Sequence, residues 1–346
     1  MKPLNLALTL TMLSSYSLNA APPLPGAQAK LDHTSVSGLS SGAFMTSQFF
    51  VAHSSIMKGA GIVAGGPYLC AQSWPNMTYF QNATTTCMNP FTSSTGPNTP
   101  LLLKKTQELS DSGDIDNIDH ISNARIYLFS GKEDTTVSTL VMDKTLEYYQ
   151  QLGVKDSAIW YNHWTNAGHA FVTNKADDNP CSKTEPPYIN NCDIDQSKRI
   201  LNHIYPGLNE PMTQLSSEPM AFDQREFIDH DFTSMSDTGY VYIPEQCQQA
   251  ACSIHVVFHG CQQGAELIGD KYYSGTGYNE MADANNLIVL YPQVRPSTSK
   301  RYNPKGCWDF WGYTSPSEAS PDYFSKSSPQ VSAVYRMVER LASAKN

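Results

Sequence analysis

The chain has 346 residues and a formal net charge of −9. Its 40% hydrophobic and 16% charged content is that of a globular protein with enough apolar side chains for a large core. The acidic balance and the lack of any Lys/Arg-rich run in the sequence argue against a nucleic-acid-binding surface, because phosphates require a basic footprint. A neutral or polymeric substrate fits this charge better.

The N-terminus has the layout of a secretory signal peptide. Lys2 precedes a largely apolar run, Leu4 to Leu13, and small residues follow around Ala21. The run is well short of the ~20 residues that a membrane-spanning helix needs. We therefore expect a signal peptide over residues 1–20, no membrane span, and a secreted or periplasmic location for a catalytic domain over residues 21–346.

Eight cysteines in an exported chain are expected to form four disulfides. In chain order they suggest three local pairs and one longer bridge: Cys70 with Cys87, Cys181 with Cys192, Cys247 with Cys252, and Cys261 with Cys307. Eight cysteines allow many other connectivities, so this pairing is a proposal. The sequence contains neither Cys-x-x-Cys nor His-Glu-x-x-His, and we expect no metal and no cofactor.

Short apolar runs alternate with helical patterns, which indicates a mostly parallel sheet with helices on both faces. The predicted strands are Thr34–Ser37, Gly61–Ala64, Arg125–Phe129, Ala158–Trp164, Tyr240–Ile243, Ile254–Phe258 and Leu287–Tyr291. Helices are predicted from Ala43, over Tyr278–Ala284, and from Pro329 to Ala344. Residues 66–122 and 172–238 lack clear periodicity, and we expect them to be disulfide-stapled loops that are either lids or binding edges of a site, or plain surface loops.

The segment Gly38-Leu39-Ser40-Ser41-Gly42 matches Gly-x-Ser-x-Gly, in which a nucleophilic serine sits on a sharp turn between a strand and a helix. The alternative is an ordinary glycine-serine loop, because so short a motif also occurs by chance. Here the motif follows a predicted strand and precedes a predicted helix, which is the context that it needs. Ser40 is therefore the candidate nucleophile.

A serine nucleophile needs an imidazole that takes its proton and a carboxylate that orients the imidazole. Asp134 follows the third predicted strand and His169 follows the fourth, so each lies just past a strand end. The order Ser, Asp, His is that of α/β-hydrolases. We favour Asp134 as the orienting carboxylate; the alternatives are that Asp134 only caps a turn or that Glu133 is the acid. We favour His169 as the base; the alternatives are that His169 is a plain loop histidine or that His163 is the base.

Two backbone amides are candidates for an oxyanion hole. One is the N–H of Ser41, and the other is the N–H of Cys261 in "FHGCQQG", although His259-Gly260 taken alone also fits a structural turn. In an ordinary α/β-hydrolase such a loop precedes the nucleophile strand, whereas here it comes 221 residues after Ser40 in the numbering of the chain. The sequence therefore predicts a single-domain, circularly permuted α/β-hydrolase. In this arrangement the N- and C-termini lie just ahead of the nucleophile strand in the fold.

Seven segments together carry a resemblance to a known family: "SGLSSGAFM", "GIVAGGPYLCA", "GKEDTTV", "AGHAF", "FHGCQQG", "TGYNEMADANNLIVLYPQ" and "NPKGCWDFWGY". From about residue 33 onward the chain resembles the extracellular polyhydroxybutyrate depolymerases, in particular their single-domain fungal type. The resemblance implies the roles given above for Ser40, Asp134, His169, Ser41 and Cys261.

The resemblance also implies that Trp308 contacts a bound 3-hydroxybutyrate chain, although by composition alone Trp308 and Trp311 would more often be core aromatics. A Cys261–Cys307 bridge would then tie the oxyanion loop to the Trp308 loop. We expect no linker and polymer-binding domain after the terminal helix, unlike in many bacterial members of the family.

The sequence thus predicts a secreted serine esterase that acts as a monomer, without a nucleic-acid partner, on poly(3-hydroxybutyrate) or its oligomers through an acyl-enzyme. One alternative is a carbohydrate esterase of the feruloyl or acetylxylan type, which uses the same triad. Another is a catalytically silent polymer-binding protein. Only the acyl pocket separates the two kinds of esterase, and the sequence does not reveal its shape.

Overall fold

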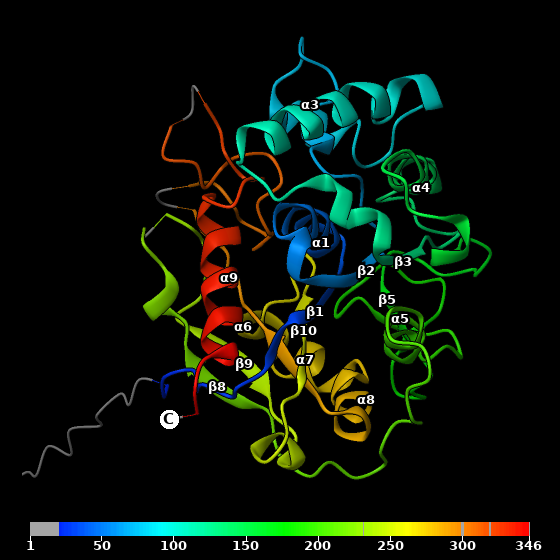
Figure 1. Cartoon of the computed structure of the whole chain (residues 1–346). Helices are drawn as coiled ribbons and strands as arrows, with labels where there is room; N and C mark the ends of the chain where they lie inside the picture. Colours follow the sequence, from blue (N-terminus) through cyan, green and yellow to red (C-terminus); the bar gives the residue numbers. More distant parts are fainter. Residues whose placement is uncertain (1–20, 231, 299–300, 318–319, 346) are drawn as a thin grey trace, which may run out of the picture.

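The computed structural model describes residues 21–230, 232–298, 301–317 and 320–345, so the expected signal peptide over residues 1–20 lies outside the described residues. An eight-stranded sheet runs through the centre of the molecule (Figure 1). Its strands, in spatial order, are β4 (Ile159–Asn162), β3 (Arg125–Phe129), β2 (Met57–Val63), β1 (Lys30–Leu39), β10 (Ser253–Phe258), β11 (Leu287–Tyr291), β9 (Thr238–Tyr242) and β8 (Met220–Asp223). Every neighbouring pair from β4 to β11 is parallel, and only β9 runs against its neighbours.

The chain enters this sheet in the middle. β1 lies between β2 and β10, so the first strand of the chain is a central one. If the two ends of the chain were joined, the order of these strands along the chain would match their order across the sheet, from β8 at one edge to β4 at the other. The one exception is that β10 and β11 are exchanged. The ends do lie side by side, because the N–H groups of Ala27 and Ala29 both donate to Leu341 O at 3.0 Å. This is the arrangement of a circularly permuted α/β-hydrolase.

Helices cover both faces of the sheet (Figure 1). One face carries α1 (Ser41–Ala52), α4 (Thr139–Gln151) and α9 (Pro329–Ala342), and α3 (Thr99–Ser112) packs on α4. The other face carries α5 (Gln196–Ile204) and α8 (Tyr278–Asn285). Strand β3 shows why two layers form, since Ile126 and Leu128 join one buried cluster while Tyr127 and Phe129 join the other.

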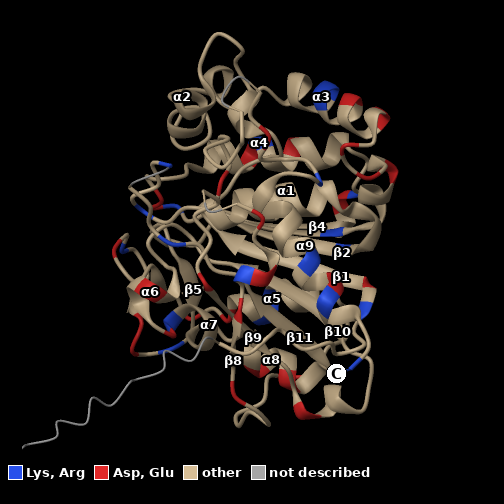
Figure 2. Ribbon diagram, turned by 90° about the vertical axis from the view of Figure 1, so that its left-hand side faces the viewer, with Lys and Arg blue, Asp and Glu red and all other residues tan. Residues whose placement is uncertain are grey.

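Shorter elements complete the described chain: α2 (Tyr79–Thr84), α6 (Ala265–Ile268), α7 (Lys271–Gly275), and a second sheet of β5 (Phe171–Thr173), β7 (Ile189–Asn191) and β6 (Asn179–Pro180). The charged residues lie mainly on the outer helices and loops, and the central strands carry few of them (Figure 2). Among the described residues, no helix has the length and apolar character that crossing a membrane requires.

The expectation that disulfides staple residues 66–122 and 172–238 is confirmed, whereas the expectation that both stretches are only loops is wrong. The first stretch holds α2 and α3, and the second holds α5, β6, β7 and β8. Helix α3 begins at a capping residue, Asn98, whose side chain accepts the Leu101 N–H, and it ends at Gly113 with φ +82°. These start and stop signals are present in the sequence, but the apolar stripe between them is narrow, with only Thr99, Leu102 and Thr106 buried.

Four disulfides join Cys70 to Cys87, Cys181 to Cys192, Cys247 to Cys252 and Cys261 to Cys307, the pairs that chain order suggested. The described part of the chain contains no free cysteine. Two of these bridges lie next to the candidate site: Cys181–Cys192 closes a loop after His169, and Cys261–Cys307 joins the loop after β10 to the "GCWDFWGY" segment.

Candidate active site

Ser40 occupies a strained turn between β1 and α1. Its backbone has φ 58° and ψ −122°, a conformation that a serine rarely adopts. The glycines on either side allow a very close approach of backbone: a Cβ on Gly38 would lie 2.4 Å from Gly42 O, and a Cβ on Gly42 would lie 2.4 Å from both Phe258 O and His259 O. The Gly-x-Ser-x-Gly motif therefore forms a tight elbow, and its second glycine packs directly against the loop after β10.

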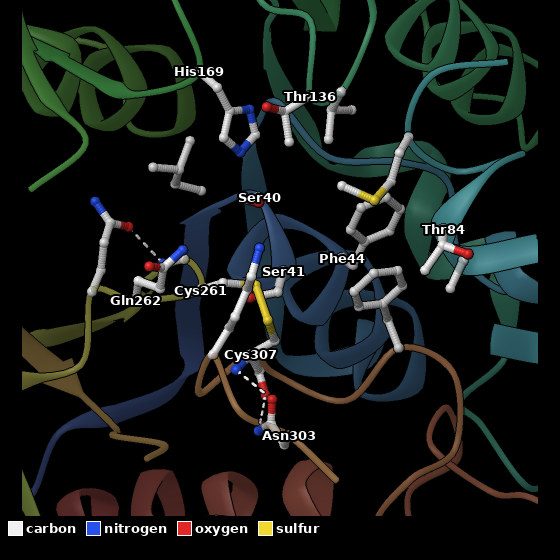
Figure 3. A pocket seen from close by; sticks show the side chains of 18 of the residues that line it. Ser40, Ser41, Phe44, Thr84, Thr136, His169, Cys261, Gln262, Asn303 and Cys307 are labelled. Atoms are coloured by element: carbon white, nitrogen blue, oxygen red, sulfur yellow. Dashed lines mark hydrogen bonds between the residues drawn. A yellow bond between two sulfur atoms is a disulfide. The ribbon is translucent and has the colours of Figure 1, made fainter. Parts of the chain in front are cut away.

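His169 and Asp134 meet beside this elbow. The His169 Nδ1 lies 2.7 Å from Asp134 Oδ2, and the Asp134 side chain is completely buried. The other carboxylate oxygen accepts the N–H groups of Thr136 and Val137 at 2.8 and 2.9 Å. Because Asp134 holds Nδ1, the opposite side of the imidazole points towards Ser40 (Figure 3).

The rivals Glu133 and His163 are both exposed, and neither lines the pocket in front of Ser40. No hydrogen bond is described between Ser40 Oγ and the His169 ring. Such catalytic bonds are often long in the absence of substrate and tighten when it binds.

The loop after β10 holds the second candidate oxyanion donor. His259 is buried, and burial lowers its pKa to about 4, so its ring is neutral at ordinary pH. Its Nε2 lies 3.2 Å from the Val294 N–H and accepts it, which leaves Nδ1–H to donate to Gly260 O at 2.7 Å. A trans peptide carries its C=O and N–H on opposite sides. Since His259 holds the Gly260 carbonyl, the Cys261 N–H of the same peptide unit faces the other way.

The amides of Ser41 and Cys261 are both available. Among the described residues, neither N–H donates to a protein acceptor, and Ser41 is the first residue of α1, where a helical N–H has no partner within the helix. Both residues line the same pocket as Ser40 and His169. Two free donors at the mouth of a strained serine turn are the arrangement that an oxyanion needs.

The pocket itself is a cavity of about 470 Å³ whose wall is largely apolar. Its aromatic and aliphatic lining comprises Leu39, Phe44, Phe80, Ala83, Met88, Val137, Tyr188, Tyr302, Phe310 and Trp311. The rings of Phe44 and Phe310 stack with their centroids 4.3 Å apart. Of these residues, only Trp311 lies in a segment that the sequence singles out, "GCWDFWGY". Most lie in loops distant from the motif, so no local pattern marks them.

Trp308 is not placed in the pocket wall. Its side chain is fully buried against Phe258 and His259, with ring centroids at 4.8 and 5.7 Å, and Trp311 lines the pocket instead. The buried carboxylate of Asp309 explains the turn, because it accepts the backbone N–H groups of residues 311–314 at 2.7–3.1 Å. A contact of Trp308 with substrate stays a prediction, and its indole N–H is buried with no hydrogen-bond partner among the described residues.

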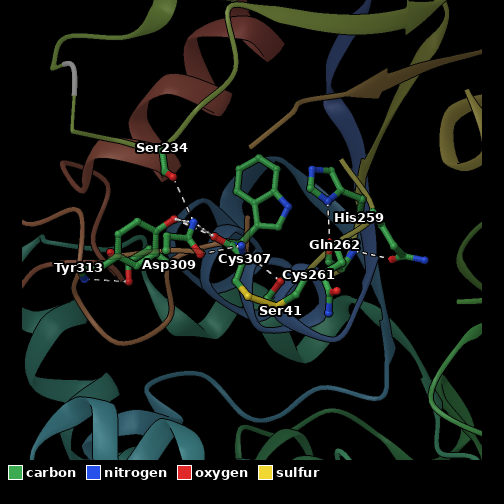
Figure 4. The surroundings of a disulfide bond; sticks show 12 residues. Ser41, Ser234, His259, Cys261, Gln262, Cys307, Asp309 and Tyr313 are labelled. Carbon is green, nitrogen blue, oxygen red and sulfur yellow. Dashed lines mark hydrogen bonds between the residues drawn. A yellow bond between two sulfur atoms is a disulfide. The ribbon is translucent and has the colours of Figure 1, made fainter. Parts of the chain in front are cut away.

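Two further links fix the Trp308 segment, one to the elbow and one to the loop after β10 (Figure 4). Ser41 Oγ accepts the Trp308 N–H at 3.2 Å, and the Cys261–Cys307 disulfide joins the residue before Trp308 to the oxyanion loop. The Ser41 side chain therefore has a structural contact of its own, in addition to the backbone N–H that the sequence motif suggests.

The fold is that of an α/β-hydrolase, and the Gly-x-Ser-x-Gly elbow and the two amides lie beside the His169–Asp134 pair. No protein-family model matches the chain. Over 333 residues the chain is 39% identical to the poly(3-hydroxybutyrate) depolymerase of Delftia acidovorans, a match that covers 94% of this chain and 63% of that protein. Over 311 residues it is 38% identical to the polyhydroxybutyrate depolymerase of Talaromyces funiculosus, covering 85% of this chain and 86% of that protein.

Two solved structures are also similar. The crystal structure of the PHB depolymerase from Penicillium funiculosum matches with a TM-score of 0.81 and 33% identity, and covers 92% of this chain and 98% of that chain. A serine-to-alanine PHB depolymerase complexed with an R3HB trimer matches with the same TM-score and coverage at 32% identity. The chain belongs to the polyhydroxybutyrate depolymerase family of carboxylic ester hydrolases, so the predicted fold and family are confirmed. It spans about 63% of the length of the Delftia relative.

Proposed function

We propose that this protein is a serine esterase that hydrolyses poly(3-hydroxybutyrate) or its oligomers. The observation that carries the proposal is the 2.7 Å contact between His169 Nδ1 and Asp134 Oδ2 beside the strained turn of Ser40, in a pocket that also contains two free backbone amides. The names of the related proteins supply the substrate class. The largely apolar pocket supports it, because the repeating unit of such a polyester carries a methyl group and no charge.

In the proposed mechanism, Ser40 Oγ attacks the ester carbonyl carbon while His169 Nε2 takes its proton. Asp134 stabilises the imidazolium through Nδ1–H. The N–H groups of Ser41 and Cys261 bind the oxyanion of the tetrahedral intermediate, and each such donor is worth about 3 to 4 kcal/mol in this kind of catalysis.

The ester C–O bond then breaks, and His169 returns the proton to the leaving alkoxide, which departs as an alcohol. Water, activated by the same imidazole, attacks the acyl-Ser40 carbonyl through a second tetrahedral intermediate. The products are a carboxylic acid and free Ser40.

Residues 21–346 form the catalytic domain in this proposal, and the protein acts as an exported monomer, extracellular or periplasmic. Four disulfides support an oxidising location, because such bonds persist outside the cytoplasm.

A turbidity assay on amorphous poly(3-hydroxybutyrate) granules, run beside feruloyl and acetyl esters, tests the substrate assignment. We expect the wild type to clear the granules and Ser40→Ala to leave them intact. If the wild type cleaves the aromatic ester and clears no granules, the assignment of poly(3-hydroxybutyrate) as the substrate is wrong. If a fluorophosphonate probe does not label the wild type, the assignment of the protein as a serine esterase is wrong.

A further inference from the structure

Residues 181–192 form a loop that the Cys181–Cys192 disulfide closes, and we call it the 181–192 loop. It contacts both the segment that carries His169 and the segment that carries the Cys261 N–H. Its Thr184 Oγ1 accepts the backbone N–H of His169 at 2.8 Å. Gly168 packs so tightly on the same loop that a Cβ there would lie 2.2 Å from Lys183 O. The backbone that carries the candidate base is thus held by the 181–192 loop.

The same loop holds the oxyanion peptide through Gln263. The side chain of Gln263 is almost completely buried, with 1% of the residue exposed. Its Oε1 accepts the Gly260 N–H at 2.7 Å, and its Nε2 donates to Pro187 O at 2.8 Å and to Tyr188 O at 3.1 Å. One amide side chain therefore joins the residue before Cys261 to the 181–192 loop, and replacing it would take this partner from the Gly260 N–H and the Pro187 carbonyl.

Strand β5, which begins two residues after His169, pairs with β7 of the 181–192 loop, but no strand pairing among the described residues joins this loop to the oxyanion peptide. His169 follows β4 at one edge of the sheet, whereas Gly260 and Cys261 follow β10, on the other side of β1 from β2, β3 and β4. In Figure 3 the labelled His169 and Cys261 lie on different sides of Ser40. The 181–192 loop is itself rigidly held, since Asn190 Nδ2 donates to Cys181 O and Lys183 O at 2.9 and 2.7 Å.

We propose that the 181–192 loop fixes the base relative to the oxyanion hole, with Gln263 and Thr184 as its two positioning residues. The proposal rests on the proposed esterase function. Donors of an oxyanion hole have to lie within a few tenths of an ångström of their place, and a misplacement of about 1 Å costs roughly 100-fold in rate. Because the developing oxyanion exists only in the transition state, loss of either contact lowers kcat and leaves KM nearly unchanged.

The test compares Gln263→Leu with Gln246→Leu on a soluble short-chain ester. Gln246 also donates its side-chain amide to a backbone carbonyl, that of Asp283, but it does not line the pocket. We expect Gln263→Leu to lower kcat by about 10- to 100-fold with KM within about twofold. The control Gln246→Leu should keep kcat within about threefold of the wild type. Circular dichroism and a melting curve establish that each variant is folded.

A second variant, Thr184→Val, keeps the side-chain shape and removes the acceptor of the His169 N–H. If the two residues act through one loop, the effects of Thr184→Val and Gln263→Leu on kcat are not multiplicative in the double variant. A folded Gln263→Leu protein with wild-type kcat, or multiplicative effects in the double variant, would overturn the proposal. A wild type that hydrolyses no ester would instead overturn the proposed function.

An independent observation concerns Lys305, which carries the only Lys, Arg, Asp or Glu side chain among the residues that line the pocket. The loop that presents it is rigid: Asn303 Nδ2 donates to Cys307 O and Asn303 Oδ1 accepts the Cys307 N–H, each at 2.9 Å, and Lys305 O accepts the Gln262 N–H at 2.7 Å. Within the described ranges, the ammonium group of Lys305 has no hydrogen-bond or ion-pair partner.

A hydroxyalkanoate chain is uncharged except for the carboxylate at one end. We infer that Lys305 binds this terminal carboxylate, so that the enzyme favours oligomers with a free acid end; this inference also rests on the proposed function. An ion pair at an exposed lysine contributes a preference of about two- to fivefold, which salt weakens.

The free acid and the methyl ester of an R3HB trimer, assayed at low ionic strength, test this inference. We expect the acid-to-ester ratio of kcat/KM to fall about two- to fivefold in Lys305→Met. Lys132→Met is the matched control, because Lys132 is exposed in the Asp134 loop but does not line the pocket. An unchanged ratio in Lys305→Met would overturn the inference, whereas a wild type that cleaves neither trimer would overturn the proposed function.

Discussion

Replacement of Gly42 by alanine tests how the serine elbow and the oxyanion loop depend on one another. The added methyl group would lie 2.4 Å from the carbonyl oxygens of Phe258 and His259, whereas ordinary contacts begin at 3.4 Å. Both neighbours are backbone atoms, so no side chain can rotate away. The elbow and the loop must therefore separate by about 1 Å, the difference between the two distances. The shift moves the Cys261 N–H relative to Ser40.

A misplacement of this size costs roughly 100-fold in rate, and overpacking of a tight backbone contact costs about 1 to 3 kcal/mol of stability. We expect Gly42→Ala to lower kcat/KM on a soluble short-chain ester by about 100-fold while the protein still folds. The measurements are steady-state kinetics and urea unfolding.

Gly275→Ala is the control, because a Cβ at this position in α7 meets no atom within 4 Å. It should keep wild-type activity and be at least as stable as the wild type, since alanine favours helix over glycine. A folded Gly42→Ala protein with kcat/KM within threefold of the wild type would refute the reasoning.

Further predictions concern single groups. Asp134→Asn should lower kcat by about 10⁴-fold, measured at saturating substrate, because the imidazole loses the partner that fixes its tautomer; a loss under tenfold would contradict the triad. Ser41→Ala should keep activity within about tenfold but lose about 1 to 3 kcal/mol in urea unfolding, since the Trp308 N–H loses its acceptor. If Trp308 contacts substrate through its indole N–H, Trp308→Phe raises KM for an R3HB trimer and not for a short ester; equal KM values would exclude that contact. Burial lowers the pKa of His255 to about 3 and of His259 to about 4, from 6.5, so the unfolded chain binds more protons below pH 6.5. Stability should therefore fall from pH 6.5 towards pH 4, and urea midpoints that do not fall over this range would contradict the burial of these rings.

The sequence was most informative where an apolar run ends at a motif. Strands β3 and β11 have the predicted bounds, Arg125–Phe129 and Leu287–Tyr291, because their buried runs are short and sharply bordered. The candidate site residues could be proposed for the same reason. Parallel strands end at one edge of a sheet, so side chains just past those ends have to converge there. Chain order alone also revealed the permutation, since an oxyanion loop late in the chain has to return beside a strand at its start.

What the sequence missed depends on contacts made at a distance. Strand β8 carries an exposed Met220 and exists because it pairs with β9 at the edge of the sheet, so it has little apolar pattern of its own. Helix α1 is buried at all twelve positions because α9 covers its outer side, and its polar residues do not mark an exposed face. Which of Trp308 and Trp311 lines the pocket depends on the buried turn around Asp309. The adjacent residues in the sequence do not specify this turn.

Intact and peptide mass spectrometry of protein quenched during turnover of an R3HB trimer tests the central claim most directly. The proposed mechanism predicts one hydroxybutyryl ester, located on the peptide that contains Ser40, and neither adduct nor hydrolysis in Ser40→Ala. Continued trimer hydrolysis by Ser40→Ala, or an acyl group attached at another residue, would contradict it.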